Sequence, residues 1–413
     1  MRIIAKEEMN RLVLIGNGFD LAHGLKTRYE DFINWYWKRR VTGLFDVKSD
    51  SSDDTLCTLE VIGETWSLFC FQNLMSINST DGKTLYQYLN KHKDKFIIRH
   101  TAFFANIHQS IETKGWVDIE NEYYKLLEHY SLENYSAKEI EKLNGQLQYI
   151  QELLTEYLTI INQEEAPIID NIRRKIYEPI NKFDISIEST KTLAEYIVWC
   201  NKQKNDVWDL KLYYYGINPI TSGYIHDIEK FKSDSTSCTE YPKTYMLPEK
   251  IMLLNFNYTK TARKYLMQDR DVFSINHIHG VLENPDSIIF GYGDEFEDKY
   301  KKLQNLNNNE CLTNIKTIRY QESDNYRKVL AFIESAPFQV YIMGHSCGNS
   351  DRTLLNTIFE HKNCISIKPY FYQKKDGTDS YIELVQNISR NFTDMKLMRD
   401  RVVNKTYCET LTD

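Results

Sequence analysis

The chain has 413 residues, of which 42% are hydrophobic and 26% charged, an ordinary balance for a globular protein with a large core. Its formal net charge of -7 argues against general nucleic-acid binding, because an acidic chain gains little from releasing phosphate counterions. The eight cysteines form no CxxC pair, which argues against a structural zinc site and favours a reducing, cytoplasmic setting. No apolar run approaches the roughly 18 residues that span a bilayer, so no membrane partner is expected.

The first predicted element is a buried parallel strand over residues 11–16, a short apolar run that ends in glycine. A helix is predicted over 21–37, after a turn at residues 16–20 that reads GNGFD. Two glycines would let the backbone approach a phosphate, and the helix would point its N–H groups at that phosphate. The turn lacks both a full GxGxxG pattern and the lysine of a Walker loop, so a plain turn in which Asp20 caps the helix is the alternative.

The middle of the chain changes character. Long segments rich in Glu, Lys, Leu and Tyr carry apolar residues at helical spacing. These segments are 85–110, 118–131, 136–163 and 188–203. We therefore predict a mostly helical insertion over residues 46–245, within an α/β core made of residues 1–45 and 246–413.

After residue 248, strand and helix patterns alternate along the chain. The predicted strands are 250–257, 272–280, 287–293, 338–344 and 364–372. The predicted helices are 258–267, 325–335, 352–361 and 381–391. This alternation predicts an α/β fold with a doubly wound, Rossmann-like parallel sheet and helices on both faces.

Polar, glycine-flanked residues follow four of the predicted strands. They lie at 16–20, 255–259, 277–280 and 344–351. Ligands of open parallel sheets bind beyond the carboxyl ends of the strands, so the joint presence of these turns predicts one site at that edge.

Asn257 and His279 are the candidate catalytic residues of this edge. The Asn257 amide could orient a water or a ribose hydroxyl, and the alternative is that it closes a turn. His277 and His279 have the spacing that places two side chains on one face of a strand. Two histidines without a nearby carboxylate or cysteine make a poor zinc site, so no metal is expected. His279 is the simpler candidate for a general base, and the alternative is a hydrogen-bonded structural histidine.

The segment GHSCG, at residues 344–348, matches the GxSxG pattern of a serine nucleophile between a strand and a helix. That class of hydrolase needs an acid and then a histidine after the serine, and only His361 follows. A second phosphate- or ribose-binding turn, with Asp351 near the start of the next helix, fits the segment better.

With these residues in view, the chain resembles the bacterial AbiH family of phage abortive-infection proteins. The likeness is carried, in order, by LVLIGNGFDLAHGLKTRYEDF (12–32), WVDIENEYY (116–124), LLNFNYT, INHIHG, IIFGYGD and IMGHSCGNSD. The same order of segments is similar to the sirtuin-like NAD-binding fold found in many antiphage proteins.

The resemblance implies NAD as the substrate, held by residues of the strand-end turns. These nucleotide contacts are Gly16, Asn17, Gly18, Phe19, Asp20, Gly280, Gly344, His345, Ser346 and Asp351. It also implies that Asn257 lies near the reacting ribose carbon and that His279 is the base. Thr259 stands where the resemblance leads us to expect an aspartate, and a zinc-binding module is missing, so a protein-deacylase groove is not expected.

The resemblance implies an antiphage function in which the nicotinamide–ribose bond of NAD is hydrolysed to nicotinamide and ADP-ribose. One alternative is a nucleotide-sensing effector that binds without cleaving and acts through its helical insertion. Another is a nucleotide-processing enzyme with a different substrate. Because such a protein must be silent before infection, we also expect a phage or host protein as trigger and a homo-oligomer.

Overall fold

The computed structural model describes residues 9–46, 51–62, 81–114, 117–185, 215, 247–267, 271–296 and 298–413. The chain divides into two compact units. The first unit consists of Met1–Gly24, Glu165–Ile288 and Tyr320–Asp413, and the second of Leu25–Glu164 and Ile289–Arg319. The first segment of the second unit thus begins before residue 46 and ends before residue 245, and its other segment, Ile289–Arg319, lies in the range predicted for the core.

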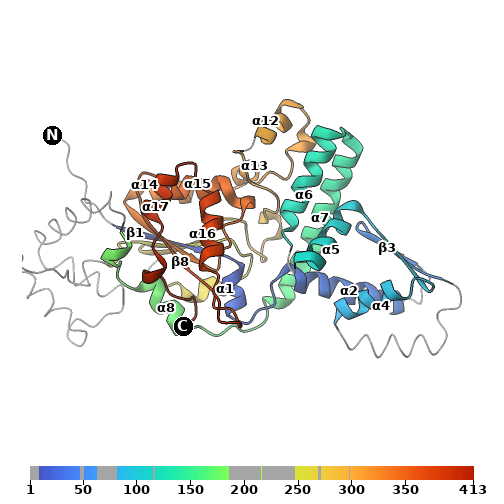
Figure 1. Cartoon of the computed structure of the whole chain (residues 1–413), viewed down its shortest axis with the longest axis horizontal. Helices are drawn as coiled ribbons and strands as arrows, with labels where there is room; N and C mark the ends of the chain where they lie inside the picture. Colours follow the sequence, from blue (N-terminus) through green and yellow to red (C-terminus); the bar gives the residue numbers. More distant parts are fainter. Residues whose placement is uncertain are drawn as a thin grey trace, which may run out of the picture. The chain divides into compact units, whose positions relative to one another are not determined.

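The first unit is built on a five-stranded parallel sheet with the order β6-β5-β1-β7-β8 (Figure 1). The strands are β1 (Asn10–Ile15), β5 (Ile251–Asn255), β6 (Phe273–His277), β7 (Phe338–Met343) and β8 (Cys364–Tyr370). Every residue of β1, β5, β7 and β8 is buried, which explains why most residues of these strands are apolar on both faces. The predicted α/β class is confirmed, and the sheet is consistent with a Rossmann-like fold.

The strand order reverses at β1. The chain places β5 and then β6 on one side of β1, and later places β7 and β8 on the other side. In open parallel sheets a ligand crevice forms at the carboxyl ends of the strands at such a reversal. Gly16 follows β1 and Gly344 follows β7, so the two glycine turns flank this point.

Helices pack against this sheet. On one face, α8 (Asp170–Tyr177) and the 3-10 helix Thr261–Tyr265 contribute to a core with side chains of all five strands. Four C-terminal helices also contact the sheet, α14 at β6 and the others at β8 (Figure 1). They are α14 (Asn325–Ser335), α15 (Arg352–Phe359), α16 (Tyr381–Arg390) and α17 (Met395–Arg401).

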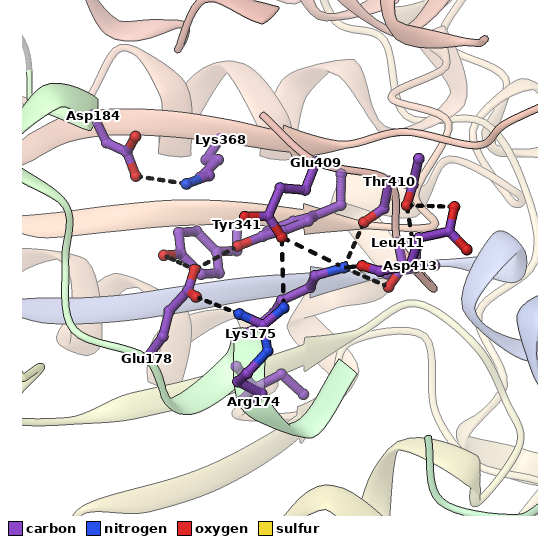
Figure 2. A network of polar contacts seen from close by, with 12 residues as sticks. Arg174, Lys175, Glu178, Asp184, Tyr341, Lys368, Glu409, Thr410, Leu411 and Asp413 are labelled. Carbon is purple, nitrogen blue, oxygen red and sulfur yellow. Dashed lines mark hydrogen bonds and ion pairs between the residues drawn. The ribbon is translucent and has the colours of Figure 1, made fainter. Parts of the chain in front are cut away.

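A network of polar contacts around the buried Lys175 holds the last residues of the chain against α8 (Figure 2). The Lys175 side chain is fully buried, and its Nζ donates to the carbonyl oxygen of Thr410 at 2.8 Å. Nearby, Lys368 Nζ lies 3.0 Å from Asp184 Oδ2, and both side chains are buried. Because each charge has a partner, burial does not leave it uncompensated.

The second unit combines helices with a small antiparallel sheet. Its longer helices are α2 (Tyr29–Asp46), α4 (Gly82–Lys91), α5 (Ala102–Lys114), α6 (Ile119–Glu128) and α7 (Ala137–Ile161). The sheet has the order β2-β3-β4, with β2 (Ser51–Asp53), β3 (Cys57–Val61) and β4 (Phe96–His100). Among all helices that the structure describes, none is long and apolar enough to cross a bilayer.

The predicted helices 118–131 and 136–163 correspond closely to α6 and α7. The prediction of helix throughout 85–110 is wrong, because β4 separates α4 from α5 within it. β4 begins with Phe96, Ile97 and Ile98, residue types that favour strands, and it pairs with β3. The predicted helix 188–203 lies outside the described residues.

Three further elements differ from their predictions. The predicted helix 21–37 is two helices, α1 (Asn17–Ala22) and α2, because Gly24 adopts a φ of 82° that interrupts a helix. The predicted helix 258–267 is a short 3-10 helix. The predicted strand 287–293 is not a strand, and Tyr292 makes an isolated bridge with Ile315.

Candidate functional site

The turn after β1 and the turn after β7 touch each other through their backbones. The Gly18 N–H donates to the Gly344 carbonyl oxygen at 2.8 Å. A Cβ atom on Gly16 would lie 2.5 Å from the His345 Cα, and one on Gly344 would lie 2.1 Å from the Phe19 nitrogen. The absence of side chains at these glycines is therefore required by contact between the two turns.

The other residues of the first turn have different surroundings. Asn17 is exposed, whereas Phe19 is buried and its ring packs edge-on against Tyr265 at a centroid distance of 5.3 Å. Gly16 occupies the N-cap position of α1, and Asp20 lies inside that helix. The alternative interpretation of Asp20 as the helix cap is therefore wrong.

Asp20 is a buried carboxylate that links the turns after β1 and β5. The Thr259 hydroxyl donates to Asp20 Oδ2 at 2.6 Å, and Asn257 Nδ2 donates to the Gly16 carbonyl oxygen at 2.9 Å. Within the described part of the chain, Asp20 Oδ1 has no hydrogen-bond partner. Burial raises the pKa of Asp20 to about 6, and the hydrogen bond from Thr259 opposes this rise. Thr259, which replaces the expected aspartate, thus serves as a donor to Asp20.

The variant Asp20→Asn is expected to be more stable than the wild type above pH 6. The pKa of Asp20 is raised from 3.8 to about 6, so its contribution to stability is complete below pH 3.8 and is lost as the pH rises through 6. Asn removes the buried charge, and a rise of this size corresponds to about 3 kcal/mol. Urea midpoints of both proteins between pH 4 and 8 measure this effect. A midpoint difference that does not change with pH would contradict the raised pKa.

His279 lies beyond the end of β6, where it contacts two polar groups. It is 5% exposed, and its Nε2 lies 3.2 Å from the Tyr320 hydroxyl and 3.2 Å from Asp351 Oδ1. The other carboxylate oxygen of Asp351 lies 3.6 Å from His345 Nε2. The structure therefore brings together one predicted catalytic residue and two predicted nucleotide contacts.

Two aromatic residues that the sequence did not single out complete this cluster. The Phe256 ring lies 5.3 Å from the His279 ring and 4.1 Å from the His345 ring, measured between centroids. The Tyr320 ring is parallel to that of His279. Phe256 directly follows β5, and this position at a strand end was the only signal for it in the sequence.

His277 belongs to a different set of contacts from His279. Its Nε2 lies 3.1 Å from the Arg263 Nε donor, and its Nδ1 lies 3.1 Å from Asn255 Nδ2. Burial, and secondarily the charge of Arg263, lowers the pKa of His277 to about 4. The prediction that both histidines share a strand face is wrong, because β6 ends at His277. Within the described ranges, no group of three or more His, Cys, Asp or Glu residues is arranged to hold a metal ion.

The remaining predicted residues lie in turns. Gly280 has a φ of 87°, and a Cβ there would lie 2.1 Å from the Ser287 carbonyl oxygen, so its turn requires glycine. Ser346 is exposed. The His361 Nε2 lies 3.2 Å from Glu334 Oε1. The only histidine that follows Ser346 in the chain is thus paired with a carboxylate on α14, which argues against a serine hydrolase.

The family model described as bacteriophage abortive infection AbiH matches residues 12–372. This range covers most of the chain and includes the glycine turns, Asp20, Asn257, His279 and Asp351. A search of the curated proteins gave no match. The chain belongs to the bacteriophage abortive infection family AbiH.

Proposed function

We propose that this protein is an antiphage enzyme that binds NAD at the carboxyl edge of the parallel sheet and hydrolyses its nicotinamide–ribose bond. The observation that carries this function is the buried pair of His279 Nε2 and Asp351 Oδ1, 3.2 Å apart, beside the reversal of strand order. An imidazole held by a carboxylate is a general base whose orientation and tautomer are fixed. The strand order and the order of the turns along the chain also support a doubly wound, sirtuin-like core.

The proposed chemistry consumes one water for each NAD. The bond between nicotinamide and the ribose C1′ breaks, and neutral nicotinamide leaves with the bonding electron pair. Water adds to the cationic ribose carbon, and His279 accepts the proton that this water loses, so the products are nicotinamide, ADP-ribose and a proton. Asn257 would orient the water or a ribose hydroxyl, and the buried Asp20 Oδ1 is an acceptor of the kind that ribose hydroxyls use.

The turn residues other than His345 and Asp351 remain predicted nucleotide contacts within this function. Asn17 and Ser346 are exposed at the tips of their turns, so their side chains are accessible to a ligand. The Gly18 N–H is already donated to Gly344, so phosphate contacts would fall to other amides of these turns.

The test is to incubate purified full-length protein with NAD and to measure free nicotinamide, with and without a chelator of divalent metals. Release of nicotinamide that persists in the chelator is the expected result. Saturable binding of NAD that remains intact, together with an unchanged NAD content in phage-infected cells that carry the protein, would contradict hydrolysis and favour a nucleotide sensor. Turnover only with a divalent metal would instead indicate a different nucleotide-processing enzyme. Because the enzyme is expected to be silent before infection, the NAD content of phage-infected cells that carry the protein is measured in parallel.

A further inference from the structure

We infer that Asp351 positions His279 and His345 as one coupled pair of imidazoles, and that His345 tunes the base instead of contacting the nucleotide. Any effect of this coupling on turnover rests on the proposed function. The coupling between the three side chains is independent of that function. His345 and Asp351 are thus positioning residues for His279.

The two carboxylate oxygens of Asp351 face different imidazoles. Oδ1 lies 3.2 Å from His279 Nε2, and Oδ2 lies 3.6 Å from His345 Nε2. All three residues are buried, with exposed fractions of 5% for His279, 6% for His345 and 8% for Asp351. The Phe256 ring packs against both imidazoles. Water is largely excluded, so the charges of the three side chains interact more strongly than they would at the surface.

The turn after β7 fixes which nitrogen of His345 carries the proton. The Cys347 N–H donates to His345 Nδ1 at 3.0 Å, so the proton of the neutral ring is on Nε2, which faces Asp351. Cys347 has a φ of 54°, which is uncommon for a residue other than glycine. The buried Asn391 holds this conformation, because its Nδ2 donates to the Cys347 carbonyl oxygen at 2.9 Å. Backbone strain is thus maintained at the point that orients His345.

The titratable groups around the pair can be named from its contacts. Asp351 and the Tyr320 hydroxyl face His279. Asp351 and Cys347 adjoin His345, and the pKa of the Cys347 thiol is raised by burial and, to a lesser degree, by Asp351. One carboxylate can neutralise one imidazolium, and a second imidazolium would leave a net positive charge in the buried cluster. His345, whose Nδ1 already accepts from the Cys347 N–H, therefore faces Asp351 with its Nε2–H and competes with His279 for the charge of that carboxylate.

The experiment follows the pH titration of His279 by NMR in full-length protein with 13C-labelled histidine rings. His345→Asn is the main variant, because the Asn side-chain oxygen can replace Nδ1 as acceptor from Cys347 while the group facing Asp351 is removed. We expect the pKa of His279 to rise by about 1 unit in this variant and to fall by about 1 unit or more in Asp351→Asn. His361→Gln serves as the control and should leave the His279 titration unchanged, because His361 is paired with Glu334.

An unchanged His279 titration in His345→Asn would overturn the coupling, whatever Asp351→Asn does. If the Asn variant fails to fold, His345→Ser provides the same test, since its short side chain also removes the group that faces Asp351 and its hydroxyl can accept from the Cys347 N–H. The pH profile of nicotinamide release gives an independent reading. Titrations that shift in a protein that releases no nicotinamide when purified and leaves NAD unchanged in phage-infected cells would refute the proposed hydrolysis and leave the coupling intact. Release without any shift of the titrations would refute the coupling alone.

Discussion

His279→Gln is expected to reduce the rate of nicotinamide release by about 10²–10⁴-fold, the usual loss when a general base is removed. Gln is chosen because its amide can keep the contacts that Nε2 makes with Tyr320 and Asp351, each at 3.2 Å, while it cannot accept a proton near neutral pH. The fold should therefore persist while turnover falls. The measurement is the initial rate at saturating NAD, together with the thermal midpoint of the variant.

A matched control exists within the same unit. His361 Nε2 also lies 3.2 Å from a carboxylate, Glu334, but His361 precedes β8 at the amino-terminal edge of the sheet. His361→Gln should therefore release nicotinamide at the wild-type rate. If His279→Gln also releases nicotinamide at the wild-type rate, His279 is not the base. If the rate falls equally in both variants, the loss reflects general destabilisation.

The core of the fold was readable from the sequence because its strands are buried on both faces. β1, β5, β7 and β8 are mostly apolar along their length, and the helices between them have their own periodicity. β4 was missed because its five residues lie between two helical segments, although three of them, Phe96, Ile97 and Ile98, are types that favour strands.

The pairing of His279 with Asp351 could not be read from the sequence. His279 follows β6 and Asp351 lies beyond β7, and these strands are separated in the sheet by β5 and β1. Both residues were predicted to lie at the correct edge, since all parallel strands end there. Which side chains touch across that edge depends on strand order and on packing around Phe256, and neither is encoded in local spacing.

The glycine turns show a second limit of sequence reasoning. A glycine that lets a phosphate approach and one that lets another backbone approach have the same sequence signature, because both need only the absence of a Cβ. In this protein Gly16, Gly18 and Gly344 bring two turns into contact, and the Gly18 N–H is donated to the Gly344 carbonyl oxygen. Contact between turns thus accounts for these glycines without a bound nucleotide.

Gly344→Ala is therefore expected to destabilise the first unit by about 2–5 kcal/mol, since a left-handed φ contributes about 1–2 kcal/mol and overpacking about 1–3 kcal/mol. Gly344 has a φ of 77°, and the new Cβ would lie 2.1 Å from the Phe19 nitrogen, a backbone atom that cannot rotate away. Gly377→Ala is the matched control, because its φ is 85° but nothing lies within 4 Å of its Cβ position. That variant should lose only about 1–2 kcal/mol, the cost of the left-handed conformation.

Chemical unfolding gives the free energy of unfolding of each variant. Both variants carry the cost of a left-handed alanine, so the difference between them measures the contact between the turns. A large difference would show that this contact stabilises the unit, and the same turn places His345 against Asp351. In that case Gly344→Ala should also shift the His279 titration, because moving the turn weakens the competition for the carboxylate. If Gly344→Ala loses no more free energy of unfolding than Gly377→Ala does, the two turns do not constrain each other. His345 would then lack the fixed position that its coupling to His279 requires.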